Sequence, residues 1–130
     1  AFLMVKVVKS ALAMGREDSY SFDTAFPNYS FHYPLRKVLQ MHVEAKIYRE
    51  KTGIYVDISL KGRLEVEDTS DASIFELPIS FFEKALAIMD KEDGEGEGYI
   101  FEGNSFDLEE LALLLIESHL PIRVTRELLK

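Results

Sequence analysis

The clearest pattern in the chain is an alternation of apolar and polar residues that begins at residue 37 and continues past residue 60. Such alternation is typical of β-strands that have one face in the core and the other in water. The inward positions are Leu39, Met41, Val43, Ala45 and Ile47 in the first run, and Ile54, Val56, Ile58, Leu60, Leu64 and Val66 in the second. Between the runs, Gly53 of the turn Glu50-Lys51-Thr52-Gly53 supplies the positive φ that short hairpin loops commonly require. The pattern predicts a long antiparallel hairpin with one dry and one wet face.

Weaker patterns predict the elements on either side of the hairpin. A valine-rich strand is expected over 3–9, a loop or short turn around Gly15, and a strand over 19–26. Residues 74–89 fit both a strand and a helix. Because Pro78 would interrupt a helix, we favour a strand beside the hairpin, with this proline at a sheet edge or a bulge.

The last third of the chain contains an acidic segment and a helix. Residues 90–98 are acidic and rich in glycine, which is typical of a mobile linker, and 99–101 fit a short strand. Asp107 predicts a helix start, because its carboxylate accepts free N–H groups of the first turn. Pro121 ends the helix. The helix is apolar except for a narrow polar stripe through Glu109, Glu110 and Glu117, so we expect it to be covered.

These elements indicate an α+β fold. We expect an antiparallel β-sheet or partly closed barrel, built on the hairpin and packed against the C-terminal helix. The length of 130 residues fits a single domain, 1–130, and a hydrophobic content of 47% is ordinary for a globular protein. The chain has no cysteine, which excludes disulfides, thiol catalysis and iron–sulfur ligation. No apolar run is long enough to span a membrane, and we expect a cytoplasmic protein that does not bind membranes.

The charge is unevenly divided along the chain. The net charge of −8 on average repels nucleic acid. Through Leu64, however, there are ten Lys and Arg against six Asp and Glu, a net of +4; from Glu65 onward there are five against seventeen, a net of −12. The two parts sum to −8, so any contact with RNA is expected to use the basic first part.

Residues with catalytic or metal-binding potential do not form a recognised pattern. His32, His42 and His119 have no partner at metal-ligand spacing. Asp68 and Asp71 could serve as paired carboxylates, but acid–base work needs a carboxyl whose pKa burial has raised, and a turn this polar should keep both solvated. We therefore predict no catalytic residue, no metal, no cofactor, no small-molecule substrate and no enzymatic activity.

The wet face of the hairpin combines cations with aromatic rings. Cations that follow phosphates, beside rings that stack on bases, are how sheets bind single-stranded RNA. Glu44, Asp57 and Glu65 dilute this charge, and lysines and tyrosines are also ordinary outward residues of strands. The candidate RNA-binding residues are Lys46, Tyr48, Arg49, Tyr55, Lys61 and Arg63.

Three features resemble a known family. The first is the strand 58–64, which contains Gly62 and is followed by a polar turn and an apolar strand. The second is the acidic segment 90–98 after that apolar strand. The third is a short strand, a Gly/Asn turn, an Asp-Leu helix start and a closing Leu-Pro, here Asp107-Leu108 and Leu120-Pro121. Over 38–124 the chain resembles the YceD-like family, the large ribosomal RNA subunit accumulation proteins. Many members carry a Cys-x-x-Cys after the hairpin, where this chain has Asp68 and Asp71, and a cysteine-bearing tail, so a role of those cysteines does not transfer.

The resemblance implies a non-enzymatic ribosome-biogenesis factor that supports accumulation or processing of large-subunit (23S) rRNA. Its partner would be this rRNA or its precursor particle. An alternative is an acidic protein-interaction module that docks a basic ribosomal protein, and a third option is a small-ligand-binding barrel.

Overall fold

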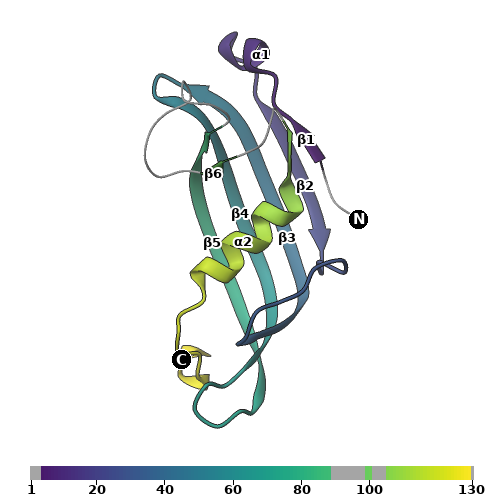
Figure 1. Ribbon diagram of the computed structural model, residues 1–130, viewed down its shortest axis with the longest axis vertical. Coiled ribbons are helices and arrows are strands. Elements are labelled where there is room, and N and C mark those ends of the chain that lie inside the picture. The colour runs from purple at the N-terminus through teal and green to yellow at the C-terminus, as the bar shows by residue number, and fades with distance from the viewer. Residues whose placement is uncertain (1–3, 89–98, 101–104, 130) are drawn as a thin grey trace.

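The computed structural model describes residues 4–88, 99–100 and 105–129. Its largest element is a five-stranded sheet with the strand order β2-β3-β4-β5-β6 (Figure 1). These strands are β2 (Asp18–Thr24), β3 (Leu35–Glu50), β4 (Gly53–Glu67), β5 (Ile74–Ile88) and β6 (Tyr99–Ile100). The first four pair antiparallel, and β6 runs parallel to β5. The remaining elements are β1 (Met4–Lys6), which pairs with β7 (Ser105–Asp107), the helices α1 (Lys9–Ala13) and α2 (Leu108–His119), and the 3-10 helix η2 (Arg126–Leu129).

The predicted hairpin is confirmed as β3 and β4. Glu50 lies opposite Gly53, whose φ of 146° is the positive value expected of the turn. One inward position was wrong: a register shift between Val38 and Gln40 makes Val38 the buried residue in place of Leu39. A β-bulge adds one residue to a strand and so reverses the alternation beyond it.

Gly62 of β4 pairs with Met41, close to this bulge. A Cβ atom at Gly62 would lie 2.0 Å from the carbonyl oxygen of Gln40 and 2.8 Å from Cα of Met41. Any side chain at this position would therefore collide with the neighbouring backbone, because ordinary Cβ contacts begin at about 3.4 Å.

The structure also decides the ambiguous and weak elements. Residues 74–88 form a strand beside the hairpin. Among the described residues, the part of this strand around Pro78 pairs with β4 alone, so the proline lies at a sheet edge. The first strand is shorter than predicted, and the stretch expected to be loop before Gly15 contains α1. The predicted linker at 90–98 lies outside the described residues.

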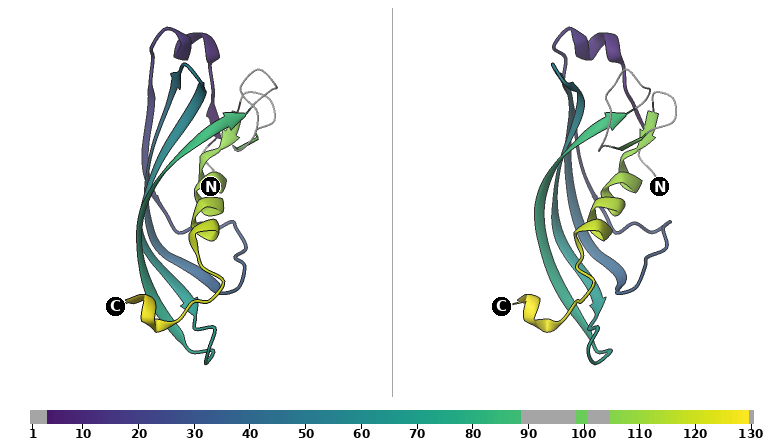
Figure 2. Two further views of the ribbon diagram at one scale, coloured as in Figure 1. Left: turned by 90° about the vertical axis from the view of Figure 1, so that its left-hand side faces the viewer. Right: turned by 60° about the vertical axis from the view of Figure 1, so that its left-hand side comes forward.

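The α+β fold is confirmed, and the described sheet curves without closing into a barrel. Helix α2 lies along its concave side (Figure 2). Asp107 caps the helix as predicted, since its Oδ1 accepts the backbone N–H of Glu109 at 3.0 Å. Leu108 is fully buried, and the extended backbone of Leu120 before Pro121 ends the helix. The four residues Asp107, Leu108, Leu120 and Pro121 therefore begin and end α2.

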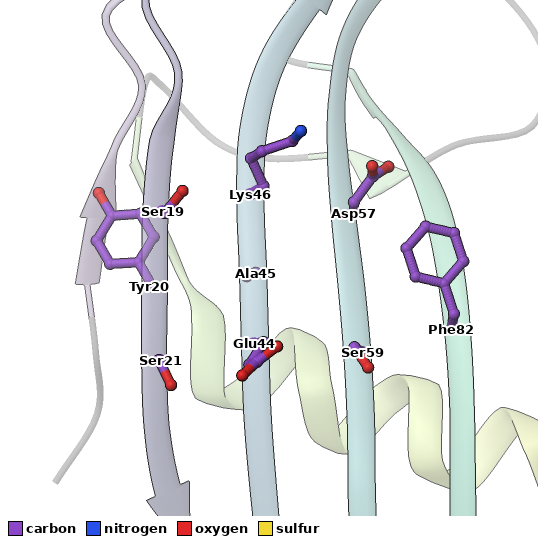
Figure 3. A pocket seen from close by; sticks show the side chains of 9 residues that line it. All are labelled: Ser19, Tyr20, Ser21, Glu44, Ala45, Lys46, Asp57, Ser59 and Phe82. Carbon is purple, nitrogen blue, oxygen red and sulfur yellow. The ribbon is translucent and has the colours of Figure 1, made fainter.

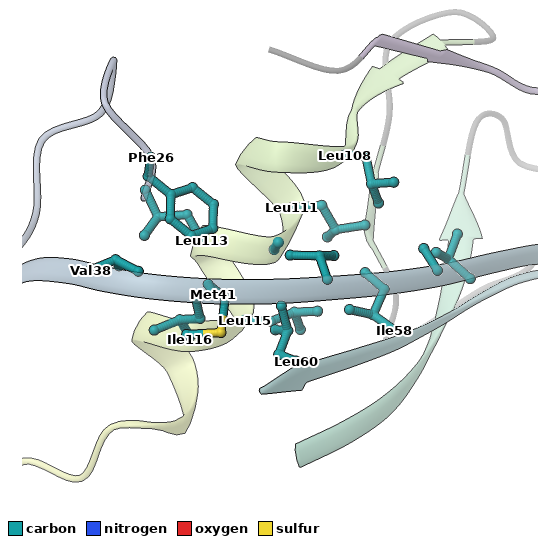
Figure 4. Packing of buried hydrophobic residues seen from close by; sticks show 14 of the residues in the cluster. Phe26, Val38, Met41, Ile58, Leu60, Leu108, Leu111, Leu113, Leu115 and Ile116 are labelled. Atoms are coloured by element: carbon teal, nitrogen blue, oxygen red, sulfur yellow. The ribbon is translucent and has the colours of Figure 1, made fainter. Parts of the chain in front are cut away.

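The core lies between the concave face and this helix (Figure 4). Its residues include Met41, Val43, Ile58 and Leu60 of the sheet and Leu108, Leu111, Leu115 and Ile116 of α2. The predicted polar stripe was partly wrong. Glu109 is only 4% exposed and accepts a hydrogen bond from Thr24 Oγ1 at 2.8 Å, whereas Leu114 is exposed.

Candidate nucleic-acid interface on the outer sheet face

The predicted wet face is the convex side of the sheet, away from α2; we call it the outer face. Its polar positions alternate with the buried ones along β2, β3, β4 and β5. Lys46 lies opposite Asp57, and Tyr48 lies opposite Tyr55. Five of the six candidate RNA-binding residues belong to this face: Lys46, Tyr48, Tyr55, Lys61 and Arg63.

The sixth candidate, Arg49, lies on the other side of the hairpin. It is opposite the buried Ile54, so its position in the strand belongs to the inner side. It lines a hollow at the hairpin tip together with Leu12 and Gly15, near α1. The tip position suggested by the sequence is correct, but Arg49 does not join the other five residues.

The aromatic pair forms a network at the tip end of the outer face. The rings of Tyr48 and Tyr55 stack with centroids 6.1 Å apart. The hydroxyl of Tyr48 donates a hydrogen bond to Asp57 Oδ1 at 2.8 Å. Burial, followed by this bond, raises the pKa of Tyr48. The tyrosine therefore remains a neutral donor through the physiological pH range.

Strand β5 contributes two outer-face residues that were not predicted. The ammonium of Lys84 lies 4.3 Å from the ring centroid of Tyr55 and 2.9 Å from Glu50. Its hydrogen bond to Glu50 raises the pKa of Lys84. Phe82 leaves 62% of its surface exposed. The sequence favours a strand here, but only the pairing of β5 with β4, Asp57 opposite Lys84 and Ser59 opposite Phe82, places both residues on the outer face of the hairpin.

Most cations of this face are paired with carboxylates. Arg63 Nη1 lies 2.7 Å from Glu76, and Lys46 Nζ lies 3.8 Å from Glu17. Lys61 has no ion pair with any described residue. The charged side chains of this face include five cations, Lys37, Lys46, Lys61, Arg63 and Lys84, and seven carboxylates, Asp23, Glu44, Glu50, Asp57, Glu65, Glu67 and Glu76. Carboxylates therefore outnumber cations on the face.

A shallow depression of about 430 Å³ lies in the middle of the face (Figure 3). It forms where short side chains stand among long ones. Its lining residues are Ser19, Tyr20, Ser21, Glu44, Ala45, Lys46, Asp57, Ser59 and Phe82.

Each histidine contacts a carboxylate rather than another histidine. His32 contacts Glu117, and His119 lies 2.8 Å from Glu83. His42 lies between Asp23 at 3.0 Å and Glu44 at 3.1 Å, and the hydrogen bonds to these two acids raise its pKa. Within the described part of the chain, no group of three or more His, Cys, Asp or Glu is placed to hold a metal ion.

The turn with the paired aspartates differs from its prediction. Asp68 is only 4% exposed, so the expectation that it is solvated was wrong. Its carboxylate accepts hydrogen bonds from the backbone N–H of Ser70 at 2.8 Å and of Arg126 at 3.2 Å. Hydrogen bonds, those of Ser70 first, lower the pKa of Asp68, which is opposite to the shift that a general acid needs. Asp71 lies 3.6 Å from the guanidinium of Arg126, so both aspartates hold the C-terminal segment against this turn.

Comparison of the chain with protein-family models, curated proteins and solved structures finds no match. The resemblance over 38–124 therefore stays a prediction. No helix within the described residues is long and apolar enough to cross a membrane.

Proposed function

We propose that this protein is a non-enzymatic factor that supports accumulation or processing of large-subunit rRNA, acting by binding rather than by catalysis. The observation that carries an RNA contact is the placement of the candidate residues. Lys46, Lys61 and Arg63 share one open sheet face with the stacked rings of Tyr48 and Tyr55. An unpaired RNA segment that crosses the strands would meet rings for its bases and ammonium or guanidinium groups for its phosphates.

The described structure adds two groups in support of this proposal. Phe82 and Lys84 extend the aromatic and cationic surface from the hairpin onto β5. Screening allows such a local contact despite the net charge of −8, because charges further apart than about 8 Å are largely screened at physiological salt.

Sedimentation with precursor particles tests the proposal. Changing Lys46, Lys61 and Arg63 together to Glu should release the protein from large-subunit precursors on a density gradient. The slope of the logarithm of the RNA-binding constant against the logarithm of the salt concentration should also decrease by about one unit for each phosphate contact that is lost.

A matched control changes Lys6, Arg16 and Arg123 to Glu, which alters the net charge equally but outside the outer face. This control should co-sediment like the parent. If the outer-face variant also co-sediments like the parent, the RNA contact does not lie on this face.

The balance of charges on the outer face favours a second candidate. A surface on which carboxylates outnumber cations can dock a basic ribosomal protein. Nuclease separates the two candidates: capture from native cells that survives complete RNA digestion and retains a basic protein would favour the second.

A further inference from the structure

The depression on the outer face has room for one planar chemical group. A cross-strand row runs Ser21, Glu44, Ser59, Phe82 over β2, β3, β4 and β5. Neighbouring strands lie about 4.8 Å apart, so Glu44 and Phe82 stand about 10 Å apart with the short side chain of Ser59 between them. A planar group therefore has room to enter between the ring and the carboxylate (Figure 3).

The chemistry of the lining selects a cation. Phe82 offers an exposed aromatic face, and the side chain of Glu44 is 62% exposed. Asp57 lies next along β4, with one oxygen bound to the hydroxyl of Tyr48. A guanidinium stacks on aromatic rings and donates paired hydrogen bonds to carboxylates, which an ammonium does less well.

We propose that this depression binds an arginine side chain of a basic protein segment. The inference rests on the second candidate function and identifies its contact site. In the lining two carboxylates, Glu44 and Asp57, face one cation, Lys46, which already lies near Glu17. Within the depression this balance attracts a guanidinium and repels a phosphate, so the depression itself fits a basic protein segment. Lys61 and Arg63, two of the three cations proposed to contact RNA, lie outside its lining. The net charge of −8 would also steer a cationic partner towards the protein.

Peptide binding to the full-length protein tests this site. The probes are short fluorescent peptides of alternating arginine and glycine, with matched peptides that carry lysine or citrulline in place of arginine. We expect the arginine peptide to bind more tightly than the lysine peptide, and the citrulline peptide to bind most weakly. Amide resonances of Glu44, Ser59 and Phe82 should shift on titration with the arginine peptide.

Two variants remove the proposed contacts singly. Phe82→Leu keeps an apolar side chain but removes the aromatic face, and Glu44→Gln removes one charge. Each should weaken binding of the arginine peptide about two- to fivefold, which is the range expected for loss of an exposed cation–π contact or ion pair. Phe82→Leu should also reduce the preference for arginine over lysine. Glu110→Gln, on an exposed position of α2, is the matched control and should not change binding.

The outcomes separate the site from the function. If the arginine peptide binds tightly and neither Phe82→Leu nor Glu44→Gln weakens it, the proposed site is refuted. The proposal that the protein docks a basic protein would then still stand. If no cationic peptide binds but single-stranded RNA does, the site and the second candidate function both fail, and the RNA proposal remains.

Discussion

Replacement of Gly62 by alanine tests the geometry of the hairpin most directly. The added Cβ would lie 2.0 Å from the carbonyl oxygen of Gln40, 2.8 Å from Cα of Met41 and 2.9 Å from the carbonyl carbon of Gln40. All three atoms belong to the backbone, so no side-chain rotation relieves the collision. To restore an ordinary contact of 3.4 Å, the oxygen and the Cβ must separate by a further 1.4 Å, the difference between these two distances.

The expected loss of stability follows from this displacement. Overpacking a tight site costs typically 1–3 kcal/mol, and moving β3 away from β4 weakens one or two ladder hydrogen bonds worth about 1 kcal/mol each. Alanine also reduces the conformational entropy of the unfolded chain, which stabilises the folded state by roughly 0.4–1 kcal/mol and so offsets part of this loss. We therefore expect Gly62→Ala to lower the free energy of unfolding by about 3 kcal/mol, a large share of the roughly 5–15 kcal/mol typical of a domain.

Urea denaturation followed by circular dichroism measures this loss. With a slope of about 2 kcal/mol per molar urea, the midpoint should fall by about 1.5 M. Gly15→Ala is the matched control, because Gly15 has a φ of +90° but no atom within 4 Å of an added Cβ. Gly62 does not have a positive φ, so Gly62→Ala measures the collision, whereas Gly15→Ala measures backbone strain without a collision. A Gly62→Ala protein as stable as the parent would show that the strands do not approach as closely as the structure has them.

Three further predictions concern the core, a histidine and metal content. Leu111→Asp should unfold the domain, because Leu111 is 3% exposed and an unpaired buried carboxylate costs several kcal/mol; an unchanged thermal melt would contradict the packing of α2 on the sheet. His42 should titrate by NMR above its ordinary pKa of 6.5, and removing both acids, Asp23→Asn with Glu44→Gln, should return the midpoint towards that value. Because the pKa of His42 is raised in the folded state, its contribution to stability is complete below pH 6.5 and is lost as the pH rises through the folded-state pKa. A titration midpoint at or below 6.5 would contradict the hydrogen bonds of His42 to Asp23 and Glu44. Elemental analysis after dialysis should find no stoichiometric zinc or iron, and one retained equivalent would overturn the prediction that the protein binds no metal.

Local patterns in the sequence predicted the elements that depend on neighbouring residues. Alternation identified the hairpin and its two faces, the turn glycine marked the reversal, and Asp107 marked the start of α2. These signals are reliable because each depends on contacts within a few residues, or on a face that must be wholly buried or wholly wet. The side of the sheet that carries Lys46 and Tyr55 was therefore predictable without a structure.

The register between distant strands decided everything else about the candidate interface. The bulge between Val38 and Gln40 moved burial from Leu39 to Val38, and the pairing of β5 with β4 brought Phe82 beside the hairpin. The chain beyond α2 covered Asp68, which otherwise belongs to a polar turn. Residue chemistry specifies which side chains prefer the core or water. Which of them meet depends on the fold, because strand register and the burial of polar groups are set by partners far away in the chain.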